Sequence, residues 1–518
     1  MNLLRAAGTV SGLTLLSRIT GLARDTLLAR AFGASIYTDA FWVAFRIPNL
    51  LRRLFAEGAF SQAFVPILGE YKTRRGDAET RVLIDRVATL LTWALVATAI
   101  AGIVLSPLFV FVIGSGLSRS DSPDGFDAAV LMTRIMFPYI VCMSLVALSA
   151  GILNTWSRFS VPAFTPVLLN LAMIAGAWIV VPGVQPPILV LAGAVMLGGV
   201  LQLALQVPVL ARQGLLPRIS WSVSQAWGDA GVRRVLGQML PATLGVSVAQ
   251  LSIIVNTNIA TWLAAGSVTW LQFADRLMEF PTALLGVALG TVLIPSLSRS
   301  SADDDPVEFS SLLDWGLRLT LLLAAPAAVG LATLSEGLAA TLFHYGRFGA
   351  RDVAMTQSAI IAYGVGLVGL VSVKVLAPGF YARQDIRTPV KIALVVLAAT
   401  QLMNLAFVPL FRHAGLALSI SLGACINALW LLHGLRRRGL YRASPGWAAF
   451  MVRLGAALAV MALLLWWCNR TVPWLALQAH AWERIGWLAL LVAGGAASYF
   501  AVLALVGVRP SQFVKRAG

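Results

Sequence analysis

The sequence predicts an all-α polytopic membrane protein with fourteen transmembrane helices. Hydrophobic residues make up 58% of the 518 residues and charged residues only 12%, a balance that soluble domains rarely have. Apolar runs of about 20 residues, the length that crosses a bilayer as a helix, recur from one end of the chain to the other. The three cysteines form no spacing motif, so we expect no disulfide framework, no metal site and no cofactor.

The predicted spans follow one another with mostly short connections. The first contains charged residues and lacks a small-residue cleavage pattern, so we interpret it as a retained span and not as a signal peptide. The fourteen spans cover residues 8–32, 36–67, 84–114, 128–151, 160–182, 186–210, 232–263, 266–297, 311–343, 353–378, 388–410, 414–435, 448–468 and 485–507.

The distribution of basic residues predicts the topology. The net charge of +17 could suggest nucleic acid as a partner, but Lys and Arg are spread over short connections and form no basic domain. With a cytoplasmic N-terminus, the inner connections hold most of the basic residues, which follows the positive-inside rule and places both termini in the cytoplasm. The outer connections then hold only Arg119, Arg347, Arg351, Arg412, Arg470 and Arg484.

An internal repeat relates the two halves of the chain. An offset of 229 residues aligns Pro66 with Pro295, and the same offset aligns Asp85 with Asp314 and Ser106 with Ser335. Farther on, "GILNTWSRFSVP" (151–162) corresponds with a small slip to "GFYARQDIRTP" (379–389). Chance similarity between apolar helices remains an alternative explanation.

The repeat predicts the domain organisation. Six spans are an even number, so both halves enter from the same side and are parallel repeats, an arrangement typical of alternating-access transporters. The last two spans lie outside the repeat. The predicted divisions are 1–212 (first lobe), 213–231 (interfacial linker), 232–440 (second lobe) and 441–518 (two additional spans).

Charged residues interrupt the first span. On a helical wheel, Ser17, Arg18, Gly21, Arg24 and Asp25 fall within a sector of about 120°. One ionised residue at the centre of a bilayer costs about 2.5–3.5 kcal/mol, so this stripe should face protein or water and not lipid.

Two further spans repeat this pattern. In the second span, Asp39, Arg46, Arg53 and Glu57 recur at spacings near seven and four, and Pro48 should bend the helix. In the eighth span, one face carries Gln272, Asp275, Arg276 and Glu279.

The three charged spans predict a cationic, water-filled cavity. Structural salt bridges, such as Arg18 with Asp25 or Arg276 with Glu279, are the alternative interpretation. Arginine is in excess over acidic residues on these spans, and its planar guanidinium suits bidentate contacts with phosphate oxygens. An anionic phosphate-bearing substrate therefore fits better than a cation.

Long polar-containing strings of the sequence resemble the MurJ (MviN) family of bacterial lipid II flippases, within the multidrug/oligosaccharidyl-lipid/polysaccharide exporter superfamily. The strings are "SRITGLARD", "TDAFWVAFRIPNLLRRLFAEGAFSQAFVP", "ILNTWSRFSVPAFTP" and "FADRLMEFPTALLGVALGTVLIPSLSRS". The resemblance implies a monomeric transporter of the bacterial inner membrane, not an enzyme. Its substrate would be lipid II, the undecaprenyl-diphosphate-linked disaccharide pentapeptide used for peptidoglycan synthesis and cell shape.

The resemblance also implies roles for individual residues. The substrate-binding positions fall on Arg18, Arg24, Arg276, Arg52 and Ser17, of which Arg18, Arg24 and Arg276 would bind the diphosphate. The positions of ion pairs that rearrange during gating fall on Asp39, Glu57, Glu279 and Asp25, with Arg52 also a member of these pairs. The two additional spans would form a groove for the lipid tail.

Three alternatives stay open at this point. One is an exporter of drugs or of another polyprenyl-linked glycan in the same superfamily. Another is a membrane enzyme acting on polyprenyl phosphates, with "ADDDP" (302–306) binding a metal ion. The third is a structural scaffold, which leaves the buried arginines without a role.

Overall fold

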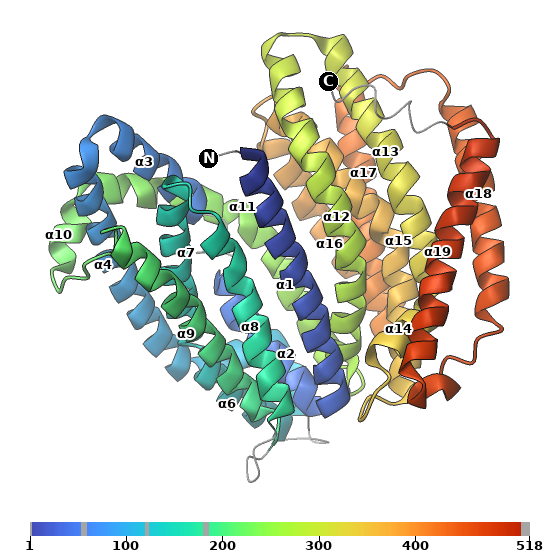
Figure 1. Ribbon diagram of the computed structural model, residues 1–518, viewed down its shortest axis with the longest axis horizontal. Coiled ribbons are helices and arrows are strands. Elements are labelled where there is room, and N and C mark those ends of the chain that lie inside the picture. The colour runs from blue at the N-terminus through green and yellow to red at the C-terminus, as the bar shows by residue number, and fades with distance from the viewer. Residues whose placement is uncertain (1–2, 53–59, 120–123, 180–185, 509–518) are drawn as a thin grey trace. The chain divides into compact units, whose positions relative to one another are not determined.

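The computed structural model of the protein describes residues 3–52, 60–119, 124–179 and 186–508, and every regular element in these ranges is a helix (Figure 1). Ten helical segments in the described ranges are long and apolar enough to cross a membrane. The predicted all-α, membrane-spanning class is therefore confirmed. The chain divides into two compact units, unit 1 up to Val268 and unit 2 from Thr269 onward.

Unit 1 is coloured blue to green in Figure 1. Within it, α1 packs along α8, and α8 packs along α9. Its elements are α1 (Leu3–Phe32), α2 (Ile36–Arg52), α3 (Phe60–Arg74), α4 (Gly76–Val104), α5 (Ser106–Gly114), the 3₁₀ helix η2 (Ser115–Ser118), α6 (Asp124–Met136), α7 (Tyr139–Thr155), α8 (Ser160–Trp178), α9 (Leu189–Arg212), α10 (Val223–Gly228) and α11 (Ala230–Thr261).

The core of unit 1 lies where α3, α4, α7 and α9 meet. Phe64 and Leu68 of α3, Ile152 of α7 and Leu210 of α9 are inaccessible to solvent, and Ile84 of α4 is nearly so. These residues recur on one face of each helix, so the apolar pattern that predicted the spans also selects the packed face.

Unit 2 is coloured yellow-green to red in Figure 1. Its helices α15 and α17 pack closely because Gly369 leaves room, and a Cβ atom there would lie 2.7 Å from the backbone nitrogen of Cys425. Its elements are α12 (Ser267–Ala302), α13 (Pro306–Thr333), α14 (Ser335–Phe343), α15 (Ala350–Tyr381), α16 (Arg387–Phe411), α17 (His413–Arg437), α18 (Trp447–Asn469), the 3₁₀ helix η3 (Ala476–Ala479) and α19 (Ala481–Leu505).

Helices also cover the predicted spans that are not among the ten apolar segments. The predicted span 8–32 coincides with α1, 36–67 with α2 and α3, 232–263 with α11, and 266–297 with α12. The number of membrane crossings stays a prediction. The predicted lobe boundaries also stay predictions, and α11 packs on α3 and α5 within unit 1.

Two spans that the sequence predicts as continuous are each broken at one leucine. The segment 84–114 separates into α4 and α5 at Leu105, and 311–343 separates into α13 and α14 at Leu334. The hydroxyls of Ser106 and Ser335 each donate to the carbonyl oxygen three residues earlier, at 2.9 Å, which offers the backbone an alternative to the helical ladder. The two breaks are 229 residues apart, the predicted offset of the repeat.

A shared turn is further support for the repeat. Ser157 after α7 and Gln384 after α15 both have φ of 58°, a left-handed conformation that few non-glycine residues adopt. In each turn the next residue donates its N–H to a carbonyl five residues earlier, Arg158 to Leu153 and Asp385 to Phe380. These turns lie in the two sequence strings that the repeat predicts to correspond.

Candidate functional site

The charged stripe of α1 lies against α8 within unit 1. Gly21, Arg24 and Asp25 are buried, whereas Ser17 and Arg18 are half-buried. The buried part of the stripe therefore faces protein, as the cost of charge in lipid requires.

Arg24 is held by its chain neighbour and by a residue of α8. Its Nε and Nη2 donate to Oδ1 of Asp25 at 2.8 and 2.6 Å, and its Nη1 donates to Oδ1 of Asn170 at 3.1 Å. The two side chains of the ion pair are 11% and 3% exposed. Nη1 also lies 3.9 Å from Sδ of Met173, so of the five N–H groups of the guanidinium one on Nη2 is left for a further acceptor.

Asn170 is a site residue that the sequence analysis missed. Its Nδ2 donates to the carbonyl oxygen of Ser17 at 2.9 Å and to the hydroxyl of Thr20 at 3.2 Å. Ser17 thus contacts α8 through its main chain. A single asparagine in the otherwise apolar segment "VLLNLAM" was the available signal, because polar residues inside spans are rare and commonly functional.

Asp39 contacts the connection between α11 and α12. Its Oδ2 accepts the backbone N–H of Gly266 at 2.7 Å, and its side chain is buried. Gly266 has φ of +95°, a conformation that a side chain would strain. Farther along α2, Arg46 donates to the hydroxyl of Thr257 in α11. Polar contacts therefore join α2 to α11 within unit 1.

The side chains of two predicted site residues, Arg52 and Glu57, lie outside the described part of the chain. Arg52 is the last residue of α2, and its side chain lies outside the described residues. Glu57 lies in 53–59, which is wholly outside the described residues.

In unit 2, Arg276 and Glu279 form an ion pair along α12. The Nη1 atom of Arg276 lies 3.1 Å from Oε2 of Glu279, and the two side chains are 24% and 48% exposed. Phe273 and Leu277 of the same helix are buried in unit 2. The charged face of α12 is thus the one that the core of unit 2 does not cover. A partly exposed pair of this kind contributes only about 0–1 kcal/mol, so it can open readily.

The acidic string 302–306 connects α12 to α13. Oδ1 of Asp305 accepts the backbone N–H groups of Val307 and Glu308 at 3.0 and 2.9 Å, which caps α13. Asp304 lies 3.9 Å from Arg383. A helix cap therefore accounts for the aspartate that precedes the proline.

Comparisons with known proteins identify the family of the chain. The sequence profile described as lipid II flippase MurJ matches residues 28–481. The chain is 56% identical over 517 residues to "Lipid II flippase MurJ" of Burkholderia cenocepacia, with 100% of both chains covered. It is 39% identical to "Probable lipid II flippase MurJ" of Vibrio cholerae, covering 98% of this chain and 97% of that protein.

Two solved structures have a similar fold. "Lipid II flippase MurJ, inward closed conformation" matches with a TM-score of 0.80 and 24% identity, covering 96% of this chain and 98% of that one. An inward-facing multidrug-resistance transporter of the MATE family and MOP superfamily matches with a TM-score of 0.62 and 14% identity, covering 84% and 98%. The full-length sequence matches establish more than the fold: the chain belongs to the lipid II flippase MurJ family.

Proposed function

We propose that this protein is a lipid II flippase, which moves the undecaprenyl-diphosphate-linked peptidoglycan precursor from the cytoplasmic to the periplasmic leaflet. The observation that carries the proposal is identity of 56% over the full chain with a protein named as a lipid II flippase. An all-helical membrane fold with arginines on α1 and α12 supports it.

Arg18, Arg24 and Arg276 are the proposed ligands of the diphosphate. Arg24 supports this role because its guanidinium is buried and one N–H of Nη2 is left for a phosphate oxygen. Asp25 then acts as an internal substitute for phosphate: it neutralises Arg24 when no substrate is bound, and the diphosphate competes with it. Ser17 and Arg52 complete the proposed substrate-binding set.

Ion pairs are proposed to rearrange during alternating access. Asp39 is part of this set because its carboxylate contacts the connection that leads from α11 into α12. Glu279 is part of it because its pair with Arg276 is partly exposed and weak. Glu57 and Arg52 enter the set through the family resemblance.

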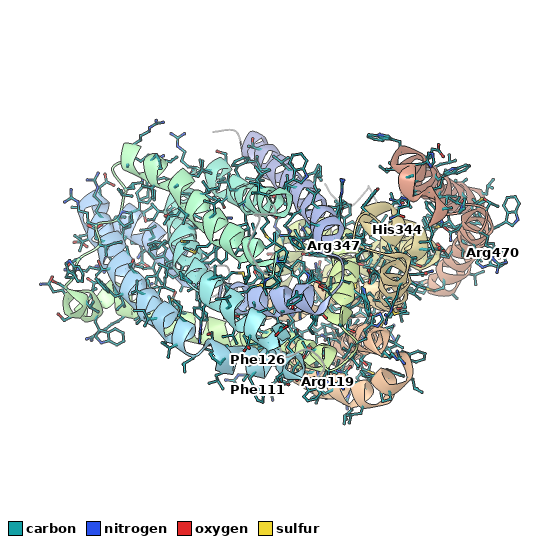
Figure 2. The ribbon with its side chains drawn as sticks, turned by 90° about the horizontal axis from the view of Figure 1, so that it is seen from below. Phe111, Arg119, Phe126, His344, Arg347 and Arg470 are labelled. Carbon is teal, nitrogen blue, oxygen red and sulfur yellow. The ribbon has the colours of Figure 1, made fainter. Side chains whose placement is uncertain are left out.

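We propose an inner-membrane location, both termini in the cytoplasm, and a monomer as the functional unit. Figure 2 labels Arg119, Arg347 and Arg470, which lie in the connections that follow η2, α14 and α18. These arginines belong to the few that the topology assigns to the periplasm. Helices α18 and α19 are proposed to serve the lipid tail, and Val452, Leu463 and Leu490 expose apolar surface there.

Depletion in the native host tests the function. Lipid II should accumulate and stay inaccessible to a periplasmic probe, and the wild-type chain should restore access whereas Arg24→Ala should not. Unchanged lipid II exposure after depletion refutes the assignment. If the Arg24→Ala variant restores access at normal protein levels, the proposed phosphate ligand is wrong.

A further inference from the structure

A basic pocket lies between α16 and α17 in unit 2, and its lining includes none of the charged residues of α12. Its volume is about 410 Å³, and it is at the end of the two helices that carries the connections 382–386 and 438–446. The topology predicts that both connections are cytoplasmic. The residues that matter here are Lys391, Ile392, Val395, Trp430, His433 and Arg437.

The charge of the pocket is largely uncompensated. Arg438 at its edge is neutralised, because it donates to Asp385 at 2.5 Å and to the hydroxyl of Thr388 at 2.8 Å. Hydrogen bonds from Thr388, together with that ion pair, lower the pKa of Asp385 to about 2, although burial opposes the shift. Among the described residues, no carboxylate lies within ion-pair distance of Lys391 or Arg437. Two cations and an exposed histidine therefore line one side.

The lining farther from these ends of α16 and α17 is apolar and open. Val395 and Trp430 are 48% and 43% exposed, and Ile392 is buried beneath them. Tryptophan is enriched at the level of lipid headgroups, where one side of its ring is apolar and the other polar. A ligand of this pocket must therefore combine an anionic group with an apolar chain.

The equivalent position in unit 1, between α8 and α9, does not carry the same set of basic side chains. The turns at Ser157 and Gln384 make Phe164 the equivalent of Lys391. The turns that end α9 and α17 also match, because Leu215 donates its N–H to Leu210 and Leu440 donates its N–H to Leu435. Aligning these two turns makes Pro208 the equivalent of His433. The same alignment makes Arg212 the equivalent of Arg437. The repeated fold thus forms without a lysine and a histidine at these two positions, so folding does not require Lys391 and His433.

We propose that this pocket binds the phosphate headgroup of an anionic membrane phospholipid, with an acyl chain along Val395 and Trp430. Basic pockets between transmembrane helices on the cytoplasmic side have this chemistry, and each cation near an anionic headgroup strengthens binding about fivefold. The proposal does not rest on the transport function, because it concerns a surface of α16 and α17 alone.

The test uses the full chain in nanodiscs with a phosphatidylglycerol that carries a photoreactive group in one acyl chain, or with the matching phosphatidylcholine. Phosphatidylglycerol should label the peptides of Val395 and Trp430 at least five times as strongly as phosphatidylcholine. The double variant Lys391→Gln, Arg437→Gln should lose that excess. Arg212→Gln, which removes the equivalent charge from unit 1, should keep it.

Competition on the wild-type chain distinguishes the possible ligands without any variant. Unlabelled phosphatidylglycerol should abolish the labelling. Protection by water-soluble glycerol phosphate at the same concentration would instead indicate a free-phosphate site. Protection by undecaprenyl diphosphate but not by phosphatidylglycerol would assign the pocket to the substrate. Either of these results, or equal labelling by the two phospholipids, overturns the proposal.

Discussion

Asp85 of α4 and Asp314 of α13 are 229 residues apart and make the same contact. Oδ1 of Asp85 accepts the backbone N–H of Arg218 at 2.8 Å, and Oδ1 of Asp314 accepts that of Ser444 at 3.2 Å. Each aspartate thereby holds the chain that follows the sixth predicted span of its half. In unit 1 that chain leads to α10, which packs on α4, and in unit 2 it leads to α18, which packs on α13.

Asp314 has more partners than Asp85, so its contact with the following chain is the stronger of the two. Asp314 also accepts the hydroxyl of Tyr441 at 2.8 Å and Nε1 of Trp447 at 2.6 Å, and its Oδ2 lies 2.9 Å from Nε of Arg318. Burial and the adjacent carboxylate raise the pKa of Tyr441, which therefore stays protonated and donates. One carboxylate thus binds both the chain that leads into α18 and the first residue of that helix.

Replacing the two aspartates should have unequal effects on stability. Asp314→Ala leaves Arg318 and three donors without their acceptor and should lower the free energy of unfolding by about 3–5 kcal/mol. Asp85→Ala removes one hydrogen bond to a backbone amide that can turn to water and should cost about 1 kcal/mol. Thermal unfolding in detergent measures both. Equal losses would contradict the difference between the two contacts.

Acidification should weaken the contact of α19 with α14. His344 is buried, and burial together with the nearby charge of Arg484 lowers its pKa, although Asp352 opposes the shift. A lowered pKa means that the folded state binds the proton less well than the unfolded state. Stability is then complete above pH 6.5 and falls below it, by at most about 1.4 kcal/mol per pH unit.

The variant His344→Gln isolates this effect. It should reduce the decrease in melting temperature between pH 7 and pH 5 relative to the wild type. His480→Gln, which replaces an exposed histidine at the start of α19, serves as the control and should leave the pH dependence unchanged. If His344→Gln keeps the full dependence, another group is responsible.

Apolar runs and the repeat predicted the fold, because hydrophobicity along a chain is a local property. The breaks at Leu105 and Leu334 were not predicted, since the apolar pattern continues across both. Their position depends on serine hydroxyls that bind the backbone, and the same hydroxyl occurs in many unbroken helices.

The candidate site was only partly predictable, because a local pattern predicts contacts within one helix but not contacts between segments that are far apart in the sequence. The spacing of Arg276 and Glu279 predicted a pair on one helix face, and the structure contains it. Asn170 could not be joined to Arg24 from sequence, because 146 residues separate them and only the packing of α1 on α8 brings them together.

Asn170→Leu should remove the contact that positions the guanidinium of Arg24 without changing the charge of Arg24. Leucine is close to asparagine in size but cannot accept from Nη1 of Arg24 or donate to Thr20 and Ser17. Flippase activity should fall at least tenfold, since a lost hydrogen bond to a charged group costs about 1.5–3 kcal/mol. The measurement is complementation of a depleted host at matched protein level. Normal growth would show that Asn170 does not position Arg24.

Lysine should be a poor substitute for arginine at position 276. Arg276→Lys keeps the charge but loses the planar arrangement of donors, so it should restore growth only partly, whereas Arg276→Ala should not restore it. Glu279→Gln breaks the pair without removing the cation and should leave substrate binding intact. Binding of lipid II to the purified variants separates these outcomes. If Arg276→Lys binds and transports as the wild type does, a point charge is sufficient.

The competition between Asp25 and the diphosphate gives the sharpest prediction for α1. Asp25→Asn keeps an oxygen where Nε and Nη2 of Arg24 donate, but it removes the negative charge that neutralises the guanidinium. The substrate then competes with a weaker internal acceptor. Affinity for lipid II should rise about tenfold or more, because charge-assisted hydrogen bonds are worth about 1.5–3 kcal/mol and 1.4 kcal/mol is a factor of ten.

Tighter binding by Asp25→Asn should accompany slower transport, because release into the periplasmic leaflet requires Asp25 to recover Arg24. Asp39→Asn is the matched control: it also neutralises a buried carboxylate of unit 1, but its contact is the amide of Gly266. It should lower thermal stability without raising affinity. Native mass spectrometry with lipid II measures binding, and accessibility of lipid II from the periplasm measures transport. If the Asp25→Asn variant is folded and binds lipid II no more tightly than the wild type, Asp25 does not substitute for phosphate, and its pair with Arg24 is structural.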